Sequence, residues 1–167
     1  MSFQKGKKGE DFAKKVLEGF DILCEKNEDY DKRYDYDLVC EMNGRRFTIE
    51  VKFDDKSSST GNLYIEYHNS KADKPSGVTV TKSDLWIQVL PEESGLKTVW
   101  VTSVKSLRDF MEKVEPYKRI AFGGDRNSAG YVYTKEAILN NLFLRIDNLD
   151  KKSVLKLIKE MLDDTKS

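Results

Sequence analysis

The chain has 167 residues, 38% of them hydrophobic and 35% charged, and its formal net charge is zero. This length supports one domain with a buried core, and the composition is typical of a globular protein with a charged surface. No apolar run approaches the ~20 residues that span a bilayer, and the N-terminus lacks the apolar stretch of a secretory signal. We therefore expect a cytoplasmic, intracellular protein with no membrane partner. A net charge of zero gives no global basic field, so any contact with nucleic acid must use local basic patches.

Residues 5–20 are predicted to form a helix, because their apolar side chains recur at helical spacing with lysines opposite. A short strand is expected at 21–25, followed by an acidic, tyrosine-bearing connection at 26–36. The two cysteines, Cys24 and Cys40, lie in strand-like segments. Their number and spacing fit neither a zinc site nor a disulfide framework, so we expect buried, reduced thiols.

Two strand-like runs, 37–42 and 46–53, are separated by Asn43-Gly44-Arg45. Asn-Gly between such runs is the strongest short signal for a β-hairpin with a two-residue turn. In that register, residues whose numbers sum to 87 lie opposite each other. A longer turn would shift the register and remove this prediction.

The predicted register gives the hairpin two different faces. One face is apolar and pairs Leu38 with Ile49 and Cys40 with Phe47, beside Val51. The other face is charged and pairs Asp37 with Glu50 and Asp35 with Lys52.

After the hairpin, residues 54–62 read as a polar, serine-rich loop. The rest of the chain alternates strand-like and helix-like segments. Strands are expected at 63–67, 85–90, 98–102 and 131–133, and helices at 104–114 (with Ser103 as its cap), from about 135, and at about 151–164. This order predicts an α/β fold with a central mixed β-sheet flanked by helices.

Carboxylates directly across a strand pair repel each other, so the pair Asp37 and Glu50 needs a compensating charge. Lys52 supplies part of it, and a divalent cation supplies more. Mg²⁺ prefers one or two protein carboxylates and keeps positions for water and substrate phosphate. A Glu-x-Lys on a strand is more often a solvated face than a site, but the opposing Asp37 favours a site that cuts phosphodiesters.

The segment YDYDLVCEMNGRRFTIEVKF resembles the core of PD-(D/E)XK nucleases, which include restriction endonucleases, Holliday-junction resolvases and phage exonucleases. Asp37 matches the first acidic position of that pattern, Glu50 the second, and Lys52 the lysine. Tyr36 stands where the pattern usually has proline. Asp35 is an alternative to Asp37, although Asp37 directly precedes the apolar run.

The segment GKKGEDFAKKVLEGF looks like the first helix of such nucleases, which often supplies a further glutamate, here Glu10. The alternative is that Glu10 forms an i,i+4 pair with Lys14, worth only a few tenths of a kcal/mol. The resemblance covers residues 6–53 and extends more loosely over SGVTVTKSDLWIQVL. It implies a restriction-endonuclease-like core and a single nuclease-like domain over 1–167.

The resemblance implies a metal-dependent DNA endonuclease, with structure-specific or resolvase-like cutting, and an exonuclease as a close variant. Mg²⁺ or Mn²⁺ would be held by Asp37, Glu50 and the Val51 carbonyl, with Glu10 holding a bound water or a second ion. Lys52 would orient the attacking water or stabilise charge on the phosphate. A homodimer follows by analogy with small members of the group, and a compact nuclease of this kind suits a phage.

Basic and polar residues near this centre are candidates for contact with DNA. Those we single out as nucleic-acid-binding residues are Lys7, Lys8, Lys14, Lys56, Ser59 and Asn62. Glu66 is a further acidic neighbour, and the loop 123–130, with Arg126 and Asn127, is a candidate clamp. His68, the one histidine, is more often a surface residue than a general base.

Two other classes remain open. The protein could be a catalytically inactive nuclease fold that binds nucleic acid or another protein, or a small interaction protein with a fortuitous Glu-x-Lys. The sequence leaves DNA versus RNA, and endonuclease versus exonuclease, undecided.

Overall fold

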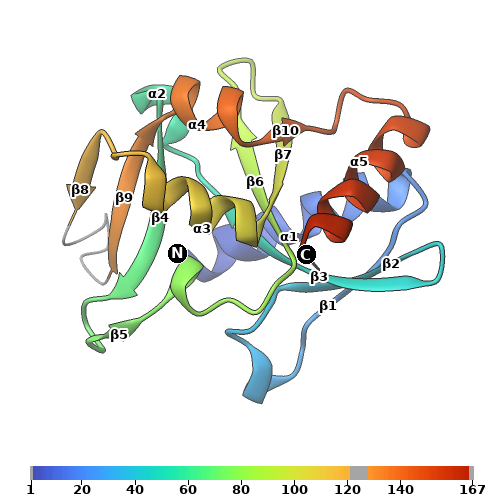
Figure 1. The fold of residues 1–167 in the computed structure, drawn as a ribbon, viewed down its shortest axis with the longest axis horizontal. Helices are drawn as coiled ribbons and strands as arrows, with labels where there is room; N and C mark the ends of the chain where they lie inside the picture. Colours follow the sequence, from blue (N-terminus) through green and yellow to red (C-terminus); the bar gives the residue numbers. More distant parts are fainter. Residues whose placement is uncertain (1, 121–127, 166–167) are drawn as a thin grey trace.

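The described part of the chain, residues 2–120 and 128–165 of a computed structural model, forms two β-sheets with helices packed around them (Figure 1). The elements in chain order are α1 (Ser2–Gly19), β1 (Leu23–Lys26), η1 (Tyr30–Lys32), β2 (Leu38–Met42), β3 (Arg45–Phe53), α2 (Ser57–Thr60), β4 (Asn62–Asn69), β5 (Lys74–Pro75), η2 (Gly77–Thr79), β6 (Leu85–Pro91), β7 (Lys97–Ser103), α3 (Val104–Lys113), β8 (Lys118–Ile120), β9 (Ser128–Thr134), α4 (Lys135–Asn141), β10 (Leu144–Arg145) and α5 (Lys151–Asp164); η marks a 3₁₀ helix.

The larger sheet has six strands in the order β1-β2-β3-β6-β7-β10. It is mixed, because β3 and β6 run parallel while its other neighbours pair antiparallel. The smaller sheet has four antiparallel strands in the order β5-β4-β9-β8. The predicted fold class, α/β with a central mixed sheet and flanking helices, is confirmed.

The hairpin of β2 and β3 closes on a two-residue turn. Asn43 and Gly44 both have positive φ, at 52° and 79°, as the type I′ turn that matches the twist of a hairpin requires. Because this turn fixes the register, the predicted pairing of the apolar face is confirmed: Leu38 lies opposite Ile49, and Cys40 opposite Phe47.

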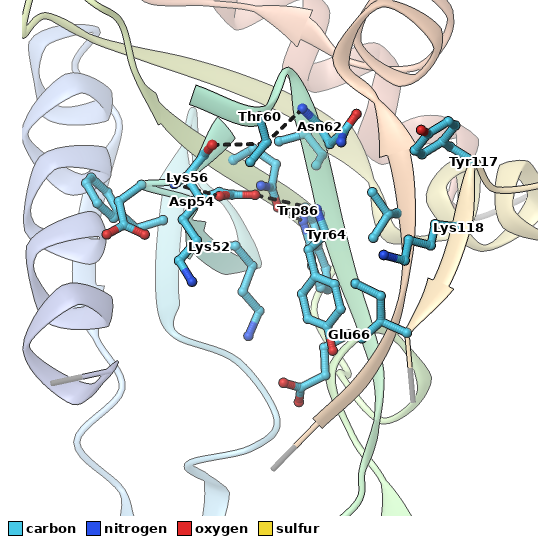
Figure 2. Close-up of a pocket in the computed structure, with 16 residues that line it drawn as sticks. Lys52, Asp54, Lys56, Thr60, Asn62, Tyr64, Glu66, Trp86, Tyr117 and Lys118 are labelled. Atoms are coloured by element: carbon cyan, nitrogen blue, oxygen red, sulfur yellow. Dashed lines mark hydrogen bonds between the residues drawn. The ribbon is translucent and has the colours of Figure 1, made fainter. Parts of the chain in front are cut away.

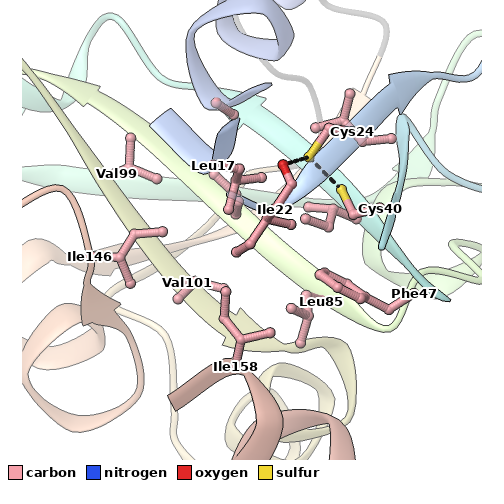
Figure 3. Packing of buried hydrophobic residues seen from close by; sticks show 14 of the residues in the cluster. Leu17, Ile22, Cys24, Cys40, Phe47, Leu85, Val99, Val101, Ile146 and Ile158 are labelled. Carbon is pink, nitrogen blue, oxygen red and sulfur yellow. Dashed lines mark hydrogen bonds between the residues drawn. The ribbon is translucent and has the colours of Figure 1, made fainter. Parts of the chain in front are cut away.

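Side chains of β6 alternate between two hydrophobic cores. Leu85, Ile87 and Val89 belong to the first core, which also contains residues of α1 and α5. Trp86 and Leu90 belong to the second core, with residues of β4, β9, α3 and α4. Figure 3 shows the first core, where side chains from distant parts of the chain meet. The larger sheet is therefore covered on both faces, with helices on one and the smaller sheet and helices on the other.

The two cysteines face each other across β1 and β2 within the first core. Cys24 and Cys40 are directly paired in register, their Sγ atoms lie 2.8 Å apart, and both thiols are buried and unlinked. Burial alone accounts for their position, because a small apolar thiol packs well between strands.

Several elements differ from the sequence prediction. The segment 54–62 is not a plain loop, because it contains α2, where the Ser57 hydroxyl donates to the Asp54 carbonyl (3.0 Å). The predicted loop over 123–130 is wrong at its end, since Ser128–Gly130 pairs in β9; Arg126, Asn127 and the rest of that loop lie outside the described residues. The short strands β5, β8 and β10 were not predicted, because two or three residues carry no periodic pattern.

The helix α5 lies where the sequence places a C-terminal helix, and Asp150 caps it by accepting from the Ser153 N–H (2.8 Å). The predicted cap of α3 is also present, because the Ser103 hydroxyl accepts from the Ser106 N–H (3.0 Å). Across residues 2–120 and 128–165, every helix is too short or too polar to cross a membrane.

Candidate functional site

Helix α1 packs closely against β3 at Gly9. A Cβ atom added to Gly9 would lie 2.8 Å from the Cβ of Phe53, so any side chain at this position would force the helix and strand apart. This contact brings the next residue, Glu10, to the charged end of the hairpin.

Glu10 lies beside the hairpin carboxylates and not beside Lys14. Its carboxylate is 4.0 Å from the ammonium of Lys26, and it is close enough to share a proton with Asp37. Burial raises the pKa of Glu10, and the hydrogen bond to Asp37 opposes that rise. Lys14 pairs with Glu18 instead (3.3 Å). The i,i+4 alternative for Glu10 is therefore wrong.

Asp37 directly precedes β2 and is fixed by the backbone of β3. Its N–H donates to the Ile49 carbonyl (2.9 Å), and its Oδ2 accepts from the Val51 N–H (2.7 Å). Burial raises the pKa of Asp37 to about 6 and Glu10 adds to the rise, while Lys52 and the Val51 N–H oppose it. Even with Lys52 nearby, this carboxylate therefore titrates just below neutral pH.

Glu50 lies on β3 with only 8% of its surface exposed. Its Oε1 is 3.1 Å from the ammonium of Lys52, and its Oε2 accepts from the Thr81 hydroxyl (3.2 Å). Burial raises the pKa of Glu50 and the charge of Asp37 adds to this rise, whereas Lys52 and Thr81 lower it. A buried carboxylate, Glu50, and a half-buried one, Asp37, both with raised pKa values, thus lie at one end of the hairpin.

Lys52 completes this group on the same face of β3. Burial lowers its pKa, but the carboxylates of Glu50 and Asp37 outweigh that effect and raise the pKa above its usual value. The ammonium therefore stays charged. It lies 5.7 Å from the centre of the Trp86 ring, and its side chain is 38% exposed, so it remains reachable by a substrate.

Asp35 does not lie opposite Lys52, and that part of the predicted pairing is wrong. The strand β2 begins only at Leu38, and Asp35 lies in the turn before it, with its carboxylate 3.6 Å from Lys82. The Asp35 carbonyl accepts from the Lys82 N–H (2.8 Å), and it shares the single Thr81 O–H (3.1 Å) with the Glu50 carboxylate. Asp35 thus holds the segment that carries Thr81.

Thr81 and Arg108 were not singled out from the sequence, although both support Glu50. Arg108 of α3 donates to the Val78 carbonyl (2.9 Å) and to the Thr81 carbonyl (2.8 Å). These bonds fix the segment whose hydroxyl meets Glu50. Thr81 and Glu50 are 31 residues apart, and no local pattern signals a contact over that distance.

A pocket of about 620 Å³ opens beside Lys52, between β3 and β6 on one side and β4, β8 and β9 on the other (Figure 2). Its lining residues are Lys52, Phe53, Asp54, Asp55, Lys56, Thr60, Asn62, Leu63, Tyr64, Glu66, Trp86, Gln88, Tyr117, Lys118, Ile120 and Val132. Its volume is in the range of ligand-binding pockets. The charged end of the hairpin thus adjoins a space large enough for a substrate group.

The predicted nucleic-acid-binding residues are not all at this pocket. Lys56 and Asn62 line it, whereas Ser59 does not and instead donates to the Lys56 carbonyl (3.1 Å). The helix residues Lys7 and Lys8 are exposed on α1, away from the lining. Of the predicted nucleic-acid-binding residues, only Lys56 and Asn62, which follow β3 in the chain, therefore lie at the pocket.

Two further residues considered from the sequence, Glu66 and His68, lie in different places in the structure. Glu66 lines the pocket, accepts from the Ser76 hydroxyl (2.7 Å) and contributes to the raised pKa of Lys52. His68 is paired with Asp73 (3.2 Å) on the far part of β4 and does not line the pocket. Only Glu66 is a neighbour of the site.

Within the described ranges, no three His, Cys, Asp or Glu side chains converge into a ready-made metal site. The oxygens of Asp37 and Glu50 are instead bonded to Val51, Lys52 and Thr81. What the structure presents is a pair of carboxylates beside a lysine, with Glu10 at the edge.

No protein-family model matches this chain, and no curated protein does. Among solved structures it is similar to a bacterial homing endonuclease, I-Ssp6803I, at 21% sequence identity and a TM-score of 0.48, over 62% of this chain and 70% of that one. At this identity and TM-score the likeness is distant and says nothing about the activity of this chain.

Proposed function

We propose that this protein is a metal-dependent DNA endonuclease that hydrolyses phosphodiester bonds with Asp37, Glu50, Lys52 and Glu10. The observation that carries the proposal is the pair of carboxylates with raised pKa values, Asp37 and Glu50, next to a charged lysine and an open pocket. Perturbed titratable groups in a cleft are typical of catalytic sites. The spacing of these residues is also that of the PD-(D/E)XK pattern.

The donor set suits Mg²⁺ or Mn²⁺. Mg²⁺ needs only one or two protein carboxylates, and water and substrate phosphate oxygens fill its other positions. Asp37 and Glu50 supply the carboxylates. The Val51 N–H points to Asp37, and because N–H and C=O of a strand residue lie on the same edge, the Val51 carbonyl lies at that edge too. Such an ion, when bound, lowers the pKa of its water and neutralises charge on the phosphate.

The other two residues act from fixed places around this pair. Lys52 stays positive and partly exposed, so its ammonium stabilises the negative charge that builds on the phosphate during hydrolysis. Glu10 is half-buried at the edge of the group. From there its carboxylate accepts hydrogen bonds from water and orients it toward the phosphate.

Outside the group of Asp37, Glu50, Lys52 and Glu10, the residues that contact the substrate lie at the pocket and on α1. Lys56 and Asn62 line the pocket, and Lys7 and Lys8 are exposed on the helix that carries Glu10. Lysines and amides commonly hold the phosphate backbone without reading sequence. We therefore assign these four residues to holding the DNA strand near the cut.

The test is cleavage of labelled linear duplex, four-way junction and single-stranded DNA, each with Mg²⁺, Mn²⁺ or EDTA. We expect cutting that requires the metal, and the preferred substrate distinguishes a resolvase-like enzyme from one that degrades ends. Well-folded protein that cuts none of these substrates with either metal would overturn the proposal.

The second candidate is an inactive nuclease fold that binds nucleic acid or protein. It is favoured by the lack of a three-residue metal cluster across the described ranges and by a net charge of zero. An inactive scaffold should show no change in melting temperature when Mg²⁺ is added, whereas an active site should show a rise.

A further inference from the structure

One of the residues that line the pocket has a buried amide with an unused donor. Gln88 is fully buried and lines the pocket, and its Oε1 accepts from the Trp86 indole N–H (2.7 Å). Because an indole N–H only donates, this bond fixes which end of the amide is the oxygen. The amide nitrogen Nε2 is left without a hydrogen-bond partner in the part of the chain that the structure describes.

An unpaired buried donor is unfavourable and rare in proteins, so it needs a physical reason. Gln88 is the register partner of Lys52 on the neighbouring parallel strand. The unused donor thus lies one strand away from the lysine of the proposed active site. A ligand that satisfies it must carry a hydrogen-bond acceptor to the part of the pocket wall that Gln88 forms.

The pocket walls are mostly apolar. They are formed by four aromatic residues, Phe53, Tyr64, Trp86 and Tyr117, and by the aliphatic residues Leu63, Ile120 and Val132. The Tyr64 ring is packed on the backbone of β9, where a Cβ atom at Gly130 would lie 2.5 Å from it. This absence of a side chain at position 130 lets the ring lie along the wall. Such walls suit a planar ring better than a bare phosphate.

Charged side chains of both signs line the pocket: Lys52, Lys56 and Lys118 beside Asp54, Asp55 and Glu66. Lys52 lies on one side and Lys118 on the other, together with Tyr117, which is 71% exposed (Figure 2). The nearby Asp54 carboxylate is already bonded to the N–H groups of Lys56 (3.1 Å) and Tyr64 (3.4 Å). Lys52 and Lys118 therefore offer two ammonium groups on opposite sides of the pocket, and either can contact an anionic group attached to a buried ring.

A planar ring with acceptor atoms and an attached phosphate is a nucleotide. We propose that this pocket receives one unpaired nucleobase of the DNA substrate, next to the phosphate cut beside Lys52, with the Gln88 amide donating to a base acceptor. The inference rests on the proposed function and adds its substrate class, DNA with an unpaired or extruded nucleotide at the cut. A base paired within a duplex cannot enter, because it must first leave the stack.

The test measures binding without cleavage, by fluorescence anisotropy in EDTA. Three labelled duplexes are compared: one fully paired, one with a single unpaired thymidine, and one in which that unpaired nucleotide is abasic. Since stacking and a buried hydrogen bond each strengthen binding, wild type should bind the unpaired thymidine at least about tenfold tighter than either other duplex. In a parallel arm, 2-aminopurine at the unpaired position reports whether the base enters an aromatic pocket.

Two variants and one control variant test which residues cause the preference for the unpaired thymidine. Gln88→Glu keeps an acceptor for Trp86 and removes the amide donor, and Tyr117→Ala removes the exposed ring at the rim. Both should reduce the preference to less than about threefold, as loss of one stacking or hydrogen-bonding group predicts. Leu96→Ala, at a residue equally exposed in the β6–β7 turn (71%), should keep the wild-type preference. Thermal melts show whether Gln88→Glu folds, and Tyr117→Ala tests the pocket without touching the core.

Equal binding of the unpaired and abasic duplexes by wild type would overturn the inference. If wild type in that case still cuts paired duplex with Mg²⁺, the proposed nuclease function survives and only the pocket assignment fails. If it neither binds nor cuts any DNA, both fail.

Discussion

The Oδ2 atom of Asp37 accepts a hydrogen bond from the Val51 N–H at 2.7 Å. The backbone ladder of β2 and β3 ends at the neighbouring pair, Leu38 and Ile49, so the Asp37 side chain accepts a hydrogen bond where backbone pairing stops. The bond ties the Asp37 carboxylate to the strand segment that carries Glu50 and Lys52. The carboxylate is half-buried here, and its removal from water is the main cause of its raised pKa.

The first prediction concerns the pH dependence of stability in metal-free protein. The pKa of Asp37 is raised from 3.8 to about 6 in the folded state, so the folded protein binds this proton more tightly than the unfolded chain does. The resulting stabilisation is full below about pH 4 and is lost as the pH rises through about 6. The loss is about 3 kcal/mol at most, at 1.36 kcal/mol per pKa unit. The raised pKa of Glu50 acts in the same direction.

Urea unfolding in EDTA across this pH range measures the effect. Asp37→Asn removes the titrating group, so the variant should lose much less stability between about pH 4 and 6. Identical pH profiles for wild type and variant would show that Asp37 is not perturbed by burial.

The second prediction concerns metal binding. A cation between Asp37 and Glu50 relieves the cost of ionising both carboxylates, so Mg²⁺ should raise the melting temperature at neutral pH. At a hundredfold excess over Kd, binding adds about 2.7 kcal/mol to stability. Asp37→Asn should lose most of this gain, whereas Lys156→Ala, an exposed residue of α5, should keep it. A gain that is the same in Asp37→Asn would place the ion elsewhere.

The third prediction separates two glycines of α1. Replacing glycine by alanine within a helix ordinarily stabilises by about 1 kcal/mol. Gly6 has open space around it, so Gly6→Ala should show this gain. Gly9→Ala should instead destabilise, because its Cβ would meet Phe53 at 2.8 Å, and cleavage should fall because Glu10 moves. Denaturant unfolding and cleavage rates check both variants. Equal stabilisation by the two would contradict the close packing.

The fourth prediction concerns Thr81, which donates to Glu50. Loss of a residue that orients a metal ligand typically costs 10–100-fold in activity, so Thr81→Val should cut at least about tenfold more slowly. Thr81→Ser keeps the hydroxyl and should cut at a rate near wild type. If Thr81 served only to stabilise the fold, both variants would lose stability and their cleavage rates would be similar. A difference between the two cleavage rates therefore reports the effect of the hydroxyl on Glu50. Equal activity of the two variants would exclude a positioning role.

The hairpin and its register could be predicted because the information is local. Asn43 and Gly44 select a two-residue turn, and that turn alone sets which residues of β2 and β3 face each other. The same register placed Glu50 and Lys52 on one face. Glu10 could be placed from the helical pattern of α1, although its partner Lys26 could not.

The rest of the site depends on contacts that no local pattern encodes. Thr81 reaches Glu50 because β3 and β6 run side by side in parallel, and Gln88 lines a pocket only when the two sheets pack together. The sequence prediction placed Asp35 opposite Lys52 because it extended the strand pairing beyond Leu38. In the structure the Asp37 side chain, and not a backbone carbonyl, accepts from the Val51 N–H. Strand crossover and sheet packing therefore limit what the sequence alone predicts here.

The most direct test of the central proposal compares Asp37→Asn with Asp35→Asn in a cleavage assay with Mg²⁺ or EDTA. Both variants remove one negative charge from the same short segment, but only Asp37 belongs to the carboxylate pair. We predict Mg²⁺-dependent cutting by wild type and by Asp35→Asn, and a loss of at least about a hundredfold in Asp37→Asn, as expected when an electrostatic catalytic group is removed. Undiminished cutting by folded Asp37→Asn would contradict the assignment of this site.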